Sequence, residues 1–334
     1  MDTIATVAIM KAAHLAWIAM VLHGAACGVP SRFVNRAPHV TRLRGGSASK
    51  EEPADLSGWD YIIIGGGAAG CVLAERLSAV PDKARVLVLE AGTDGSRDLR
   101  IRIPAGLVKV FKSERDWDFN TKSEAANRDR EVYLCRGKVL GGSSCTNVML
   151  YHRGSPADYE SWVAAGAEGW GPKEVLDYYR RAEHSVDGRS QYHGTGGPMP
   201  VDDVPYVNVL SKVFTEACGE FGYRKNADFN DWSSPQDGFG RFKVTQRSGE
   251  RCSAANAYLE GTESRENLCV KTAVHVTRVL LEGAGDDVCA SGVEYMDADG
   301  ERKTVHLAPG GEVLMCAGAV QVRLVLRSCS SNAF

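Results

Sequence analysis

The glycine-rich stretch from Asp60 to Gly70 constrains the fold of this 334-residue chain more than any other feature. Residues 61–64 form a short apolar run rich in β-forming side chains, which predicts a buried strand. Gly65, Gly67 and Gly70 follow, and residues 69–79 have the composition of a helix. We therefore predict a strand, a tight glycine turn and a helix in direct succession.

The spacing Gly-x-Gly-x-x-Gly at 65–70 is typical of a dinucleotide-binding fingerprint. The first glycine makes the turn, the second lets the backbone approach a pyrophosphate, and the third lets helix and strand pack closely. A second apolar strand over residues 85–89 ends at Glu90, about 20 residues past Gly70, where an acid meets a ribose hydroxyl. A glycine turn in an unrelated α/β protein is the competing interpretation. The strand, the helix and the acid together favour a nucleotide, but they do not distinguish NAD from FAD.

The length and composition narrow the class of protein. A chain of 334 residues predicts about two domains. With 44% hydrophobic residues, 24% charged residues and a net charge of −3, it has no basic excess that would favour nucleic acid. The ten cysteines include no Cys-x-x-Cys pair and no zinc-ligand spacing. We therefore predict no metal site, and the scattered thiols favour a reducing compartment such as the cytosol or a plastid.

Residues 1–57 have the composition of a targeting leader followed by a polar linker. After Asp2 there is no acidic residue until Glu51, which is typical of an organelle transit peptide. Residues 15–22 are apolar, as in a signal peptide, but are far short of the roughly 20 residues of a membrane span. We predict a chloroplast leader and no transmembrane segment. A secretory route, a two-part plastid leader and an uninformative disordered leader stay open.

The second informative stretch covers residues 134–154. Gly141 and Gly142, followed by two serines, form a run of small residues whose backbone N–H groups a flat or anionic ligand can approach closely. Asn147 then offers an amide donor and an acceptor, which suit the polar edge of a heterocycle. A plain turn with Asn147 as a helix cap is the alternative, and the residues alone leave both open.

Taken together, the two stretches resemble the glucose–methanol–choline (GMC) family of FAD flavoenzymes. The matching pattern is Gly137-Lys138-x-Leu140-Gly141-Gly142-Ser143-Ser144-x-x-Asn147-x-x-x-Tyr151-x-Arg153-Gly154. Thr146 departs from the aliphatic residue that is commoner in the family. The resemblance implies that the cofactor is FAD.

The same resemblance assigns candidate cofactor contacts beyond the three glycines. It implies that Ala68 and Ala69 face the pyrophosphate, that Glu90 binds the adenosine ribose, and that the backbone of Val276 meets the adenine. It further implies that a second set of residues lies along the flavin and its phosphates, namely Leu140, Ser143, Asn147, Val148, Met149 and Leu150.

Three segments are closest to one branch of the family, the algal fatty-acid photodecarboxylases. They are residues 151–154, 228–233 and 307–313. This resemblance implies light-driven decarboxylation of long-chain fatty acids to hydrocarbons. An FAD-dependent alcohol or choline-type dehydrogenase is the alternative, with a small-molecule alcohol as substrate, and so is a non-catalytic FAD-binding fragment. An NAD-linked dehydrogenase would need a hydride-transfer His or Tyr/Lys constellation that the sequence does not show.

The predicted fold is α/β: a doubly wound, mainly parallel Rossmann-like FAD-binding domain with helices on both faces of the sheet, and part of a second, antiparallel-sheet substrate domain. The expected divisions are 58–154 and 246–320 for the FAD-binding domain and 155–245 for the substrate domain. The resemblance implies a strand over 267–279 that returns to the nucleotide domain.

The tail at 321–334 departs from the family pattern, because it has neither the Ser/Thr-Pro step nor the Ser-Gly-x-Gly continuation. A natural short isoform and a mis-spliced end would both produce this tail. We expect the resemblance to cover the first half of a family member, with the catalytic residues in the second half, so we assign none.

We interpret His193 as a structural loop residue and Trp117 as a packing residue.

Overall fold

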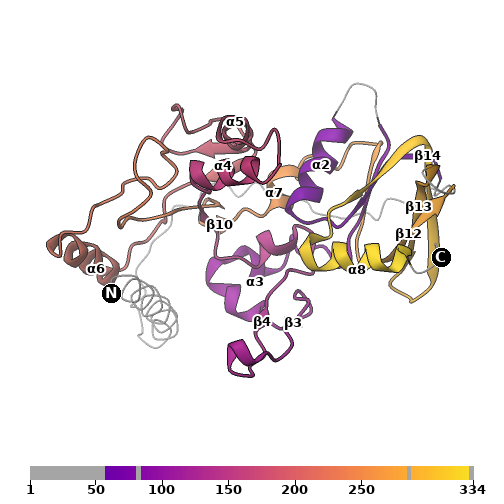
Figure 1. Cartoon of the computed structure of the whole chain (residues 1–334), viewed down its shortest axis with the longest axis horizontal. Coiled ribbons are helices and arrows are strands. Elements are labelled where there is room, and N and C mark those ends of the chain that lie inside the picture. The colour runs from indigo at the N-terminus through magenta and orange to yellow at the C-terminus, as the bar shows by residue number, and fades with distance from the viewer. Residues whose placement is uncertain (1–56, 80–83, 284–286, 331–334) are drawn as a thin grey trace, which may run out of the picture. The chain divides into compact units, whose positions relative to one another are not determined.

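The computed structural model describes residues 57–79, 84–283 and 287–330, which belong to one compact unit spanning residues 55–334 (Figure 1). The predicted leader at 1–57 therefore lies outside the described residues except for Ser57. The described helices are α2 (Ala68–Ser78), α3 (Leu99–Arg102), α4 (Pro156–Ala164), α5 (Pro172–Ala182), α6 (Val209–Glu220), α7 (Ala254–Tyr258) and α8 (Gly318–Ser330), with 3₁₀ turns η1 (Pro104–Lys109), η2 (Ala125–Asn127) and η3 (Gly142–Cys145).

A six-stranded sheet is the largest sheet among the described residues. Its strands lie in the order β11 (Leu268–Lys271), β2 (Val86–Leu89), β1 (Trp59–Ile64), β14 (Arg302–Met315), β13 (Cys289–Met296) and β12 (His275–Glu282). The first four run parallel, and β12, β13 and β14 form an antiparallel meander. The central strand β1 is therefore flanked by β2 on one side and β14 on the other. Such a reversal of strand order is where open α/β sheets bind ligands, outside the carboxyl ends of the strands.

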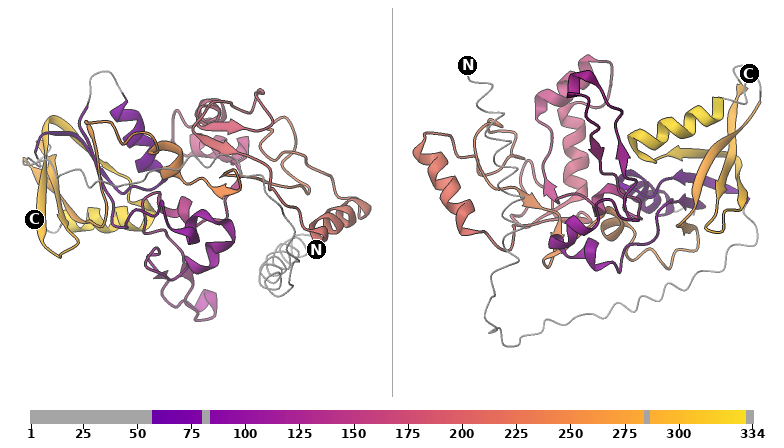
Figure 2. Two further views of the ribbon diagram at one scale, coloured as in Figure 1. Left: turned by 180° about the vertical axis from the view of Figure 1, so that it is seen from behind. Right: turned by 90° about the horizontal axis from the view of Figure 1, so that it is seen from below.

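The two central parallel strands, β1 and β2, are buried on both faces, which explains their continuous apolar runs. Ile63 of β1 packs with α2 and α7 on one face, through Ala74 and Tyr258. On the opposite face, Ile62 and Ile64 pack against the meander and against Val325 of α8. Figure 2 shows α8 beside the strands of this sheet. The predicted doubly wound α/β fold is confirmed, and the second face is covered by the meander as well as by a helix.

The predicted continuous strand over residues 267–279 is two strands. β11 ends at Lys271 and β12 begins at His275. Between them Ala273 adopts a left-handed backbone with φ 58° and donates its N–H to the carbonyl of Gly92. This break lets the chain leave the parallel sheet and enter the meander that covers it.

Short ladders connect parts of the chain between β2 and β11. They are the antiparallel pairs β5 (Leu150–Tyr151) with β8 (Lys243–Val244) and β9 (Gln246–Arg247) with β10 (Glu250–Arg251), and the parallel pair β6 (Glu183–Ser185) with β7 (Met199–Val201). A hairpin of β3 (Phe119–Asn120) and β4 (Tyr133–Leu134) stands apart from these. None of the described helices is both long and apolar enough to cross a membrane.

Candidate functional site

A cleft of about 940 Å³ lies at the carboxyl ends of the parallel strands. The fingerprint turn, Glu90 and the end of β14 line it from the sheet side. Its other walls are formed by residues 142–144, by Trp117 just before β3 and Phe119 in β3, by the start of β12 and by α8. The cleft therefore sits at the position that the strand order predicts for a ligand.

Each of the three fingerprint positions requires glycine for a different structural reason. Gly65 has φ 98°, and a Cβ there would lie 2.7 Å from the carbonyl oxygen of Cys316. A Cβ on Gly70 would collide with the carbonyl oxygen of Gly65. At Gly67, in contrast, an added Cβ would meet protein atoms only at 4.0 Å. The space beside Gly67 belongs to the cleft, as expected where a backbone must admit a phosphate.

The N-terminus of α2 also opens into this cleft. Gly67 is its N-cap and provides no side-chain cap. Ala68 and Ala69, which begin the helix, are exposed and line the cleft. Uncapped N–H groups and the helix dipole favour an anion at this end of a helix.

The glycine-serine loop meets the fingerprint turn directly. The N–H of Gly141 donates to the carbonyl of Gly66 at 2.7 Å. Gly142 has φ 55°, and a Cβ on it would lie 2.8 Å from the Cα of Gly67. Two glycine-bearing turns that lie far apart in the sequence therefore converge on one cleft.

Glu90 is buried, with 6% of its surface exposed, and both carboxylate oxygens are engaged. One accepts the N–H of Gly66 at 2.7 Å and the other accepts the N–H of Gly92 at 2.7 Å. Burial raises the pKa of this carboxyl, although these hydrogen bonds oppose the shift. A carboxylate has about four acceptor positions, so Glu90 retains capacity for the hydroxyl groups of a ribose while it holds the turn.

The other predicted contact residues are placed differently from one another. Val276 and Ser143 line the cleft. Leu140 packs beneath Gly66, where a Cβ on that glycine would touch its Cδ1. Asn147, Val148 and Leu150 lie on an exposed continuation of the loop outside the cleft wall, whereas the side chain of Met149 is buried, with its backbone at φ 62°.

An aromatic wall that we had not assigned to the site lines the cleft beside Val276. The Trp117 and Phe119 rings stack with centroids 5.8 Å apart and an interplanar angle of 5°. His275 meets Trp117 edge-on at 5.9 Å, and the ammonium of Lys138 lies 4.8 Å from the Trp117 centroid. Two aromatic residues separated by one residue in the sequence are the available signal, but only the fold brings them next to β12.

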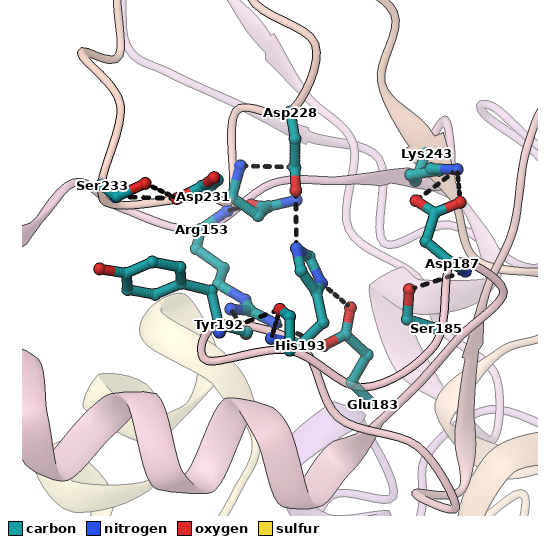
Figure 3. A network of polar contacts seen from close by, with 12 residues as sticks. Arg153, Glu183, Ser185, Asp187, Tyr192, His193, Asp228, Asp231, Ser233 and Lys243 are labelled. Atoms are coloured by element: carbon teal, nitrogen blue, oxygen red, sulfur yellow. Dashed lines mark hydrogen bonds and ion pairs between the residues drawn. The ribbon is translucent and has the colours of Figure 1, made fainter.

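His193 lies in a polar network away from the cleft, shown in Figure 3. Its Nδ1 is 2.9 Å from Glu183 and its Nε2 is 2.6 Å from Asp228. Glu183 also accepts from Arg153 at 2.6 Å, and both of these side chains are fully buried. These contacts tie together the segments around residues 153, 183, 193 and 228, which agrees with the predicted structural role of His193.

The described part of the chain has no candidate metal centre, and the two thiols beside the glycine turns are not activated. The residues at 57–79, 84–283 and 287–330 contain no group of three His, Cys, Asp or Glu side chains placed to hold a metal ion. Cys71 and Cys145 flank the glycine turns, but burial raises their pKa values to about 12 and about 11. Such thiols are protonated and poorly nucleophilic at neutral pH.

A parallel sheet whose central strand runs into a Gly-x-Gly-x-x-Gly turn, with an acid ending the next strand, defines a dinucleotide-binding domain. A model of the GMC oxidoreductase family matches residues 59–332. The chain therefore belongs to the GMC oxidoreductases, a family of FAD-dependent enzymes, and this membership identifies the cofactor as FAD. This confirms the family and the cofactor predicted from the sequence.

Known proteins agree with this assignment. The chloroplastic fatty acid photodecarboxylase of Chlamydomonas reinhardtii is 47% identical over 270 residues, covering 80% of this chain and 43% of that protein. The alcohol dehydrogenase (acceptor) of Pseudomonas putida is 41% identical and covers 80% and 47%. The crystal structure of pyridoxine 4-oxidase from Mesorbium loti matches with a TM-score of 0.73 at 33% identity, covering 80% and 51%. The chain spans about half the length of the curated relatives it matches.

Proposed function

We propose that this chain is the FAD-binding part of a flavoprotein that decarboxylates long-chain fatty acids in the light. The observation that carries FAD binding is the contact between the turns at Gly67 and Gly142 at the mouth of one cleft. The photodecarboxylase assignment is supported by the 47% identity to the algal enzyme, and by the segments 151–154, 228–233 and 307–313 that resemble that branch.

The residues of the cleft suit the parts of FAD in order. The N–H groups at Ala68 and Ala69 would take the pyrophosphate, beside the open space at Gly67. Glu90 would accept from the ribose hydroxyls, and the wall at Val276 would meet the adenine. The loop at 143–150 would lie along the flavin. Bound FAD supplies light absorption and one-electron oxidation of a carboxylate; we assign no residue of this chain as an acid or base in that chemistry.

A dark alcohol or choline-type dehydrogenase is the second candidate. It is supported by the 41% identity to the alcohol dehydrogenase of Pseudomonas putida, over the same share of this chain. The proposed cofactor-binding residues are compatible with both reactions, because both reactions use FAD.

Two assays on the purified chain separate these functions. FAD that co-elutes in gel filtration and gains fluorescence on denaturation establishes binding. Release of carbon dioxide from palmitate under blue light alone then supports the photodecarboxylase, whereas dye reduction by an alcohol or choline in the dark supports the dehydrogenase. FAD binding without either reaction would favour the non-catalytic fragment. The proposed location is the plastid, and a fluorescent protein fused after residue 57 tests it.

A further inference from the structure

Arg251 is a buried cation for which the described residues provide no counter-ion. It ends β10, and 4% of its surface is exposed. Its Nε donates to the carbonyl of Ile101 at 3.0 Å and its Nη1 donates to the carbonyl of Ser144 at 3.0 Å, but no carboxylate in the described chain lies within ion-pair distance. Its Nη2 has no hydrogen-bond partner. Because burying an unpaired charge is costly, this arrangement calls for a reason beyond packing.

The third contact of Arg251 leads to the predicted flavin loop. Its Nη1 also donates to the Oδ1 of Asn147 at 2.8 Å, and the N–H of Met149 donates to the same oxygen at 3.0 Å. Two donors can face only the oxygen of an amide, so these contacts decide which way the amide of Asn147 is turned. The amide nitrogen of Asn147, Nδ2, must therefore point away from Arg251. This nitrogen has no hydrogen-bond partner among the residues that the structure describes.

We infer that Arg251 is a positioning residue of the FAD site: it turns Asn147 so that the loop presents a hydrogen-bond donor, backed by a fixed positive charge, to the flavin. This inference rests on the proposed binding of FAD along residues 143–150. A donor and a cation both favour an electron-rich partner, because they stabilise added negative charge in a site of low dielectric. The loop therefore binds the edge of the flavin that carries hydrogen-bond acceptors. This contact raises the midpoint potential of the bound cofactor.

Asn147→Asp is the sharpest test, because it separates stability from binding. Asn147 is exposed, so its substitution does not disturb the core. The new carboxylate gives Arg251 the counter-ion it lacks, so the melting temperature should hold or rise. The outward donor is lost and the positive charge is neutralised, so FAD should bind roughly 10- to 100-fold more weakly. If the substitution weakens the binding of reduced FAD by roughly 10- to 100-fold more than that of oxidised FAD, the two-electron midpoint potential falls by about 30–60 mV.

Two substitutions of Arg251 and one matched control complete the experiment. Arg251→Met removes the charge and should weaken FAD binding and lower the potential in the same way as Asn147→Asp. Arg251→Lys keeps the charge without the planar fork, and should give intermediate values. Arg247→Met is the control, since Arg247 lies in the same segment, is 52% exposed and pairs with Glu260. It should leave FAD binding and potential unchanged.

The readouts are the dissociation constant of FAD by titration calorimetry and the midpoint potential by dye-equilibrated reduction. Wild-type FAD affinity and potential in both Asn147→Asp and Arg251→Lys would overturn the inference, whatever Arg251→Met does to folding. If the wild-type chain itself binds no FAD, the proposed function fails together with the inference. If it binds FAD and the variants do not differ from it, only the inference fails.

Discussion

Protonated His193 should stabilise the fold at neutral pH and cease to do so in mild alkali. Its ring nitrogens face the carboxylates of Asp228 and Glu183, and the hydrogen bond to Asp228 is the largest of the causes that raise its pKa from 6.5 to about 9. A basic group with a raised pKa contributes its full stabilisation below its unfolded pKa and loses it as the pH rises through the folded value. The window is therefore pH 6.5 to about 9.

The size of this effect follows from the shift. A change from 6.5 to about 9 corresponds to at most about 3 kcal/mol, at 1.36 kcal/mol for each pH unit. His193 is 13% exposed, so solvent screens the contacts only in part. One kcal/mol shifts the melting temperature by roughly 2–4 °C in chains of 150–250 residues. The wild-type protein should therefore lose several degrees between pH 6.5 and pH 9.5 through this group alone.

Thermal unfolding of the wild type and His193→Gln across this pH range measures the effect. The stability difference between them should be largest at pH 6.5 and shrink by up to about 3 kcal/mol by pH 9.5. His306→Gln is the control, because His306 is an exposed residue of β14. Parallel curves for wild type and His193→Gln would refute the reasoning, as would an imidazole that titrates near 6.5 by NMR.

Three further predictions concern the cleft. Glu90→Ala should leave the N–H groups that it now accepts unpaired, at about 1–3 kcal/mol each, and should lower FAD occupancy; a wild-type melting temperature would contradict this. Gly142→Ala should abolish FAD binding because its Cβ meets Gly67, whereas Gly166→Ala, which also has positive φ but faces open space, should bind FAD normally. Trp117→Ala should weaken FAD by about 1–3 kcal/mol through lost stacking, with Trp117→Phe in between, as titration calorimetry would measure.

Patterns among residues that are close in sequence predict the fingerprint strand, turn and helix. The strand, turn and helix at 59–78 follow from an apolar run, three glycines and helix-forming residues that are neighbours in sequence. Glu90 followed from its distance along the chain. The loop at 141–147 was ambiguous from its residues alone, and the family pattern resolved it. Its contact with the fingerprint then appears in the structure as the hydrogen bond from Gly141 to Gly66.

Features that depend on distant contacts were not predictable. The break at Ala273 arises because the chain must leave one layer of the sheet and cover it with another, which no periodicity in residues 267–279 reveals. The sequence indicates only a packing role for Trp117. Its place in the cleft wall depends on the fold, which brings it beside His275. His193 contacts Glu183, 10 positions away, and Asp228, 35 positions away, and Glu183 contacts Arg153, 30 positions away, so the sequence does not pair these residues.

Two buried arginines differ in the partners that the fold gives them. Arg153 stands in the family pattern at 137–154 and Arg251 at the end of β10, and neither residue has a carboxylate partner that its position in the sequence would reveal. In the structure Arg153 meets Glu183 at 2.6 Å, which satisfies its charge within the chain. Arg251 meets only carbonyl oxygens and the amide of Asn147. An ion pair satisfies the charge of Arg153, whereas the buried charge of Arg251 has no such partner among the described residues, and this difference is the basis of the positioning role inferred for Arg251 through Asn147.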